Sequence, residues 1–121
     1  MIQVVFDINS QPYVRTTQKQ KFFCKRYAKY HKWKITMRKL WAKQNKSLPN
    51  ELTVTFIIGM PKSWSKKKKM DMNGRYHQQK PDLSNLVKAF EDAIYTDDSC
   101  IYKYVEIKKI WGIKNEIILS I

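Results

Sequence analysis

The stretch KPDLSNLVKAFEDAIYTDDSCIYKYVEI, residues 80–107, carries the clearest structural signals in the chain. Its apolar side chains recur at helical spacing and would form one buried face: Leu83, Leu86, Val87, Phe90 and Ile94. Pro81 cannot extend a helix backward, and Asp82 or Ser84 can cap a first turn. The pattern predicts a helix over residues 81–95, then a strand over residues 101–111 that is rich in Tyr, Val and Ile.

Outside this stretch, strands and one further helix are predicted. Apolar residues alternate over residues 2–8 and 52–58, which is typical of half-buried strands, and a last strand is expected over residues 116–121. Residues 17–46 lack Gly and Pro and place aromatic and aliphatic side chains at helical spacing. That stripe is more typical of a core than of a base-stacking platform. The order β-α-β-loop-α-β-β predicts an α/β or α+β fold, with a mixed four-stranded sheet and two main helices.

The length of 121 residues suits one domain, which we expect to span residues 1–121. No run of about 18 apolar residues is present, so we expect no membrane span. The N-terminus lacks a basic start and a cleavage site, so it is not a signal peptide, and a cytoplasmic protein is expected. Cys24 and Cys100 lie in no metal-binding motif and are expected to be reduced thiols.

The charge points to a polyanionic partner. The chain has 24 Lys and Arg against 10 Asp and Glu, a formal net charge of +14. This favours a nucleic-acid-binding protein, although a basic RNA-binding or ribosomal component would share the composition. The acids are unevenly placed, because none lies between Asp7 and Glu51 and five lie between Asp82 and Asp98. Such a cluster in a basic chain indicates a divalent metal, which makes carboxylates compatible with a phosphate ligand.

A second basic feature is the segment over about residues 61–80, which we expect to be a mobile loop. It is either a solvated charge run or a loop that grips DNA. Its candidate nucleic-acid-binding residues are Lys66, Lys67, Lys68, Lys69, Arg75 and Lys80.

The acidic stretch contains the groups that phosphodiester hydrolysis needs. Ser84, Lys88 and Glu91 share one helix face, and Lys88 could pair with Asp92 one turn away. Carboxylate oxygens hold Mg²⁺ or Mn²⁺, which makes hydroxide available near neutral pH. A nearby ammonium can stabilise charge on the phosphorus. A helix cap and an Asp-Asp turn are also common structural features, so spacing alone leaves both interpretations open.

The same stretch resembles the signature of the RusA family of Holliday-junction resolvases, which are common on phages and prophages. That signature reads approximately K-P-D-x-D-N-L-x-K-x-x-x-D-A-L, then a short gap and D-D-x-x-V/I. The matching residues here are Lys80, Pro81, Asp82, Asn85, Leu86, Lys88, Asp92, Ala93, Ile94, Asp97, Asp98 and Ile101. The upstream MPKSWSKKKK is also similar to the strand-to-loop segment of the family.

The resemblance implies a homodimer that nicks four-way DNA junctions with Mg²⁺ or Mn²⁺, in DNA recombination and repair. Asp82, Lys88 and Asp98 would be catalytic, and Asp92 would be a supporting residue. Ser84 replaces the usual second aspartate, so Glu91 or Asp97 would join Asp82 and Asp98 as metal ligands, or the site would be weaker. The alternative is a non-catalytic junction-binding protein that has lost its metal site. The strand over residues 101–111 is a candidate dimer surface.

Overall fold

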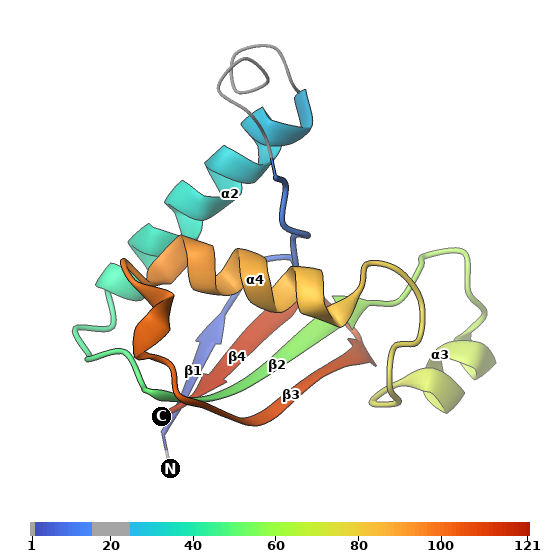
Figure 1. Ribbon diagram of the computed structural model, residues 1–121. Coiled ribbons are helices and arrows are strands. Elements are labelled where there is room, and N and C mark those ends of the chain that lie inside the picture. Colours follow the sequence, from blue (N-terminus) through green and yellow to red (C-terminus); the bar gives the residue numbers. More distant parts are fainter. Residues whose placement is uncertain (1, 16–24) are drawn as a thin grey trace. The chain divides into compact units, whose positions relative to one another are not determined.

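The computed structural model describes residues 2–15 and 25–121 (Figure 1). The elements run in the order β1 (Gln3–Phe6), α2 (Lys25–Ala42), β2 (Glu51–Gly59), α3 (Lys66–Met72), α4 (Leu83–Ile94), the 3₁₀ helix η1 (Asp98–Cys100), β3 (Lys103–Gly112) and β4 (Glu116–Ser120). This confirms the predicted α+β class with a mixed four-stranded sheet. The predicted start of the first helix, residues 17–24, lies outside the described residues, as does Cys24.

The chain forms two compact units, each built from segments that are far apart in sequence. The first contains Met1–Ser10, Pro49–Lys80 and Ile101–Ile121, and the second contains Gln11–Leu48 and Pro81–Cys100. Neither unit is therefore a continuous piece of the sequence. No described helix is long and apolar enough to cross a membrane.

The first unit is organised by the sheet, whose strand order is β1-β4-β2-β3. β2 pairs with β3 in parallel and with β4 antiparallel, so Val54 lies between Leu119 and Ile107 in the register. The alternation predicted from sequence is present, since one set of strand residues is buried: Val4, Phe6, Leu52, Val54, Phe56, Ile117 and Leu119. These residues form the core face of the sheet.

The segment over residues 61–80 differs from the loop that we expected, because α3 occupies its middle. Ser65 is the N-cap residue, and its hydroxyl accepts a hydrogen bond from the backbone N–H of Lys68 at 3.1 Å. Four consecutive lysines carry no apolar periodicity, which is why the pattern did not indicate a helix. Gly74 follows with φ +83°, a backbone conformation that favours glycine.

Aromatic packing and backbone pairing hold this segment to the edge of the sheet. The Trp111 ring lies 4.7 Å from the Trp64 ring and 4.2 Å from the His77 ring, measured between centroids. The backbone N–H groups of Gly74 and His77 donate to the carbonyls of Trp111 and Lys109 at 2.9 and 3.0 Å. Residues 74–77 thereby extend the sheet alongside the last part of β3.

The second unit pairs α2 with α4. Tyr30, Trp33 and Met37 of α2 are buried, which confirms that this part of the apolar stripe belongs to a core. Arg38 Nε donates to the carbonyl of Ala93 at 2.8 Å, so α2 also bonds the last turn of α4. This contact fixes the end of α4 that leads into residues 95–100.

Candidate active site

Asp82, one of the two capping candidates, is the N-cap residue of α4, but its side chain makes no capping hydrogen bond. Its side chain is exposed. The carboxylate is therefore available to a ligand, and the positive end of the helix favours a negative group there.

Lys88 lies on the exposed surface of α4 and contacts a residue that sequence reasoning missed. Its Nζ lies 4.5 Å from the centroid of the Tyr13 ring. Tyr13 is fixed in turn, because its backbone N–H donates to the carbonyl of Asn85 at 3.1 Å and its ring packs edge-on against Tyr30 at 5.7 Å. A cation over an aromatic face is attracted to it, so Tyr13 restrains the Lys88 ammonium near the first turns of α4.

Asp97 and Asp98 follow the C-terminal end of α4, and both are exposed. A side-chain carboxylate oxygen of Asp97 accepts a hydrogen bond from the backbone N–H of Ser99 at 3.0 Å. Hydrogen bonding from Ser99 lowers the pKa of Asp97 below its ordinary value, so Asp97 is ionised at neutral pH. Asp98 begins η1.

Helix α4 separates the two ends of the candidate site. Its 12 residues give an axis of about 18 Å. The chain from Tyr95 to Asp98 spans at most about 10 Å even when extended. Figure 1 shows η1, which begins at Asp98, beside the C-terminal end of α4, so Asp98 lies at the opposite end of this helix from Asp82.

The two substitutes considered for the missing aspartate also lie apart from Asp82. Glu91 is only 6 % exposed, whereas Ser84 in the first turn is exposed. Asp97 lies with Asp98 beyond the other end of α4. Within residues 2–15 and 25–121, no three His, Cys, Asp or Glu side chains are grouped so that they could hold one metal ion.

The donor chemistry nevertheless fits magnesium. Mg²⁺ prefers hard oxygen ligands, keeps several waters, and is commonly bound through one or two carboxylates together with a substrate phosphate. Asp82 and Asp98 offer exposed carboxylates of that kind. The complete ligand set, Asp82, Asp98, Asp97 and Glu91, stays a prediction.

Asp92 joins the two helices of the unit. Its carboxylate accepts a hydrogen bond from Tyr30 Oη at 2.6 Å and lies 3.1 Å from Lys34 Nζ. The ion pair with Lys88 that the spacing suggested is replaced by these contacts. Burial acts to raise the pKa of Asp92, but the hydrogen bonds from Tyr30 and Lys34 outweigh it and hold the pKa below its ordinary value. These contacts support a structural role.

The predicted DNA-binding residues lie in the other unit, at α3 and the residues after it. Lys66, Lys67, Lys68 and Lys69 are consecutive in α3, and none has an acidic partner within ion-pair distance in the described part of the chain. Arg75 and Lys80 are exposed as well. This unit therefore offers a run of positive charge without an ion pair in the described part of the chain, and Asp71 is the one acidic residue of α3.

Tyr13, Tyr30 and Lys34 are the residues that sequence reasoning did not find. Each contacts the acidic stretch from a segment more than 50 positions away, so no local periodicity marks it. The helical spacing over residues 17–46 is consistent with the burial of Tyr30 but does not indicate its hydroxyl contact.

Comparison with known proteins shows the family of the chain. A family model described as endodeoxyribonuclease RusA matches residues 6–121, nearly the whole chain. No curated protein and no solved structure matches the chain. The matched region contains the helix with Asp82 and Lys88, the Asp97–Asp98 pair and the lysines of α3, and the family acts on branched DNA junctions. The chain therefore belongs to the RusA endodeoxyribonuclease family.

Proposed function

We propose that this protein is a structure-selective endonuclease that resolves four-way DNA junctions by metal-dependent phosphodiester hydrolysis, in DNA recombination and repair. The observation that carries the proposal is the family match over residues 6–121, which includes Asp82, Lys88 and Asp98. The exposure of all three side chains supports it, because a backbone phosphate can approach each of them.

Asp82 and Asp98 are the carboxylates that we assign to the metal, with Mg²⁺ or Mn²⁺ as the cofactor. When bound, such an ion supplies Lewis-acid chemistry toward a phosphate and the attacking water. Of the two, Asp82 is the better supported as a metal ligand. Its side chain makes no capping hydrogen bond, and it lies at the end of α4 that favours an anion.

Lys88 supplies positive charge to the phosphate. Its ammonium is exposed, and it is held over the Tyr13 ring two turns from Asp82. A restrained cation stabilises the charge that develops on the phosphate oxygens without first having to be ordered. Tyr13 thus positions Lys88 and does not itself react.

The lysines of α3, with Arg75 and Lys80, bind the DNA backbone in this proposal. Unpaired ammonium groups bind phosphates and release counterions, which makes affinity depend on salt but not on sequence.

We further propose a homodimer, since paired cuts need two sites related by a two-fold axis. We place the dimer interface at the first half of β3, on the basis of two features. β3 ends the strand order of the sheet, and Tyr102, Tyr104 and Val105 are 73, 56 and 54 % exposed. An open strand edge with exposed apolar side chains pairs readily with another strand. Sedimentation equilibrium of wild type and Val105→Lys tests this, with a dimer expected only for wild type.

A plasmid with an extruded cruciform tests the activity. Wild type with Mg²⁺ or Mn²⁺ should linearise it, and Asp82→Asn should lower the rate by about 100-fold or more while junction binding persists. Asp7→Asn is the matched control, because it also removes one exposed negative charge and lies in the other unit. Equal cutting by wild type and Asp82→Asn would overturn the catalytic role.

A second function, junction binding without catalysis, is favoured by two observations. Ser84 stands where the family motif has a carboxylate, and the described residues contain no group of three metal-binding side chains. Titration with Mn²⁺ separates the two functions. A nuclease should bind Mn²⁺ through Asp82, whereas a protein that only binds junctions should select them with no Mn²⁺ affinity and no cutting.

A further inference from the structure

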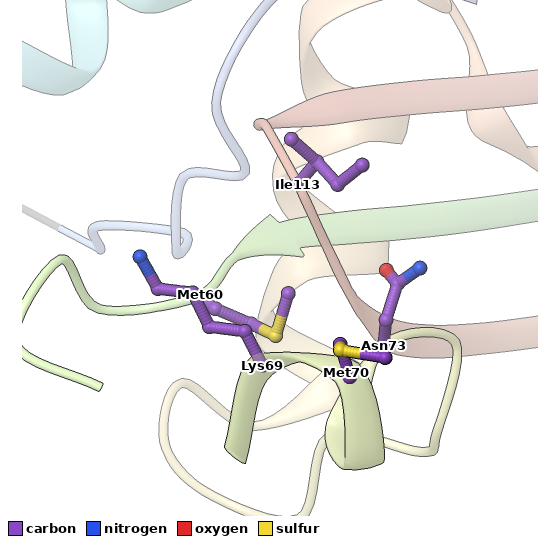
Figure 2. A pocket seen from close by; sticks show the side chains of 5 residues that line it. All are labelled: Met60, Lys69, Met70, Asn73 and Ile113. Carbon is purple, nitrogen blue, oxygen red and sulfur yellow. The ribbon is translucent and has the colours of Figure 1, made fainter. Parts of the chain in front are cut away.

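A small hollow opens beside the basic helix, within the first unit (Figure 2). It has a volume of about 220 Å³, and its lining is mostly apolar: Met60, Lys69, Met70, Asn73 and Ile113. Ile113 comes from the turn after β3 and lies across the hollow from the side chains of α3 (Figure 2). Two segments that are far apart in sequence thus form its opposite walls.

Backbone contacts preform these walls. The N–H of Met60 donates to the carbonyl of Gly112 at 3.0 Å, and the N–H of Gly59 donates to the Asn115 side chain at 2.8 Å. A Cβ at residue 112 would overlap the Ile57 side chain, so glycine leaves room for Ile57 beside this wall. The Trp64 ring, which precedes the N-cap of α3, packs against Trp111 of β3 and so ties the start of α3 to the sheet. A ligand would therefore meet a formed site and would not have to order one.

The side chains at the rim are unusual for a surface. Met70 and Ile113 are 81 and 85 % exposed, although both are large and apolar. Exposed apolar side chains around a concavity mark a binding surface more often than isolated ones do. Methionine adapts its shape to flat ring systems through a polarisable sulfur.

Charge indicates which partner the hollow accepts. Lys69 lines it directly, and Lys66, Lys67 and Lys68 extend the positive charge along α3 with no acidic partner among the described residues. A phosphodiester strand that follows these lysines would place its bases against the apolar rim. The Asn73 side-chain amide, which also lines the hollow, can both donate to and accept from a base edge.

The volume of the hollow limits the size of the ligand that it can bind. A cavity of about 150 Å³ accommodates one benzene ring. The 220 Å³ hollow therefore suits a single ring system such as a nucleobase, and it is below the usual range for larger ligands of about 300–1,000 Å³. Bases inside an intact duplex are stacked and cannot enter, whereas an unpaired or weakly stacked base leaves the stack at low cost.

We infer that this hollow binds one unstacked nucleobase at the branch point of a DNA junction while the lysines of α3 hold the adjoining backbone. The inference rests on the proposed function and deepens it. It supplies a physical basis for structural selectivity, since phosphate contacts alone would bind duplex and junction alike.

The test uses a four-way junction and a matched duplex that each carry 2-aminopurine, whose fluorescence rises when it unstacks. Binding is measured in EDTA, so cutting plays no part. Wild type should raise the fluorescence of the branch-point base and not that of the duplex. Met70→Ser combined with Ile113→Ser should abolish the rise and reduce the preference for the junction over the duplex by about tenfold, the order of one lost base-stacking contact. Because both side chains are exposed, the fold is expected to tolerate the changes.

Ile2→Ser is the matched control, because Ile2 is 55 % exposed and does not line the hollow. It should behave as wild type. A fluorescence rise that survives in the double variant overturns the inference, and so does selective junction binding by wild type with no rise. In either case the proposed nuclease function stands. If wild type shows no preference for the junction over the duplex, the proposed function fails together with the inference.

Discussion

Asp82 and Asp98 lie beyond opposite ends of α4, separated by a helix of 12 residues whose axis is about 18 Å long. Both are exposed, and both lie within the residues that match the family. We predict that, in the proposed homodimer, Asp98 of one chain joins Asp82 of the partner chain at one metal ion.

Mixed dimers test this relationship. Asp82→Asn and Asp98→Asn homodimers should each lose cutting, because each removes one carboxylate from both sites. If Asp98 serves the site of its partner, a mixed dimer retains one complete site, so co-refolded protein should recover single nicks in the cruciform plasmid. Gel electrophoresis separates nicked circles from linear products. Absence of any recovery would mean that both residues act within one chain.

Ser84 provides a second prediction. Replacing Ser84 with Asp should strengthen Mn²⁺ binding by about tenfold, because a charged oxygen ligand is gained. The first turn of α4 also favours a negative charge. Ser84→Asn is the control, since it adds an oxygen without a charge. Electron paramagnetic resonance of free Mn²⁺ measures the affinity, and an unchanged value for Ser84→Asp would show that residue 84 does not face the ion.

The lysines of α3 should set the salt dependence of DNA binding. Each lost phosphate contact reduces the slope of log K against log salt by about 0.9. Lys66→Gln combined with Lys67→Gln should therefore lower the slope by nearly two for duplex and junction alike. Lys114→Gln is the control, because that ammonium lies near Asp7 and Glu116. An unchanged slope in the double variant would exclude α3 from the backbone contacts.

The Tyr30–Asp92 hydrogen bond should stabilise the second unit. Tyr30 is 1 % exposed, and burial together with Asp92 raises its pKa, so the hydroxyl stays protonated and donates. Tyr30→Phe should lower the free energy of unfolding by about 1–2 kcal/mol at pH 7. A hydrogen bond to a fully buried charged group would contribute more, but Asp92 is partly exposed to solvent. Urea titration measures the loss. Tyr102→Phe should lower the free energy of unfolding by less, since the 3.4 Å hydrogen bond from Tyr102 Oη to Glu51 is exposed to solvent.

This loss should depend on pH. The pKa of Asp92 in the folded protein lies below the ordinary value of 3.8, so its contribution is complete above that value and disappears as the pH falls through the folded pKa. The difference between wild type and Tyr30→Phe should therefore shrink in strong acid. A constant difference would mean that the hydroxyl acts through packing alone.

His77 should make the protein less stable in mild acid. It is 5 % exposed, and its Nδ1 has no hydrogen-bond partner among the described residues. Burial, together with the nearby Lys109, lowers its pKa below the ordinary 6.5. The unfolded chain therefore binds a proton more readily, so the free energy of unfolding should fall as the pH drops below about 6.5. His77→Phe should flatten this dependence between pH 7.5 and 5.

His31 is the matched control for this measurement. It is exposed, so His31→Phe should retain the decrease that wild type shows. Thermal unfolding at each pH measures all three proteins. A wild-type stability that is constant from pH 7.5 to 5 would contradict the prediction.

The sequence by itself determined the elements whose signals are local. Alternation over residues 52–58 and helical spacing from Leu83 to Ile94 each follow from neighbouring side chains, and both elements form where predicted. The motif containing Asp82 and Lys88 indicated the family, which the comparison confirms. These elements can be predicted because the spacing of apolar residues within one helix or strand already indicates which of its faces is buried.

Only the tertiary structure decided which groups meet. Tyr13 lies under Lys88, and Asp92 pairs with Lys34 and not with Lys88, its neighbour one turn away. The hollow beside α3 likewise needs Ile113, from a distant turn. Such contacts join segments far apart in the chain, and their partners are set by how helices and strands pack, which no local period encodes.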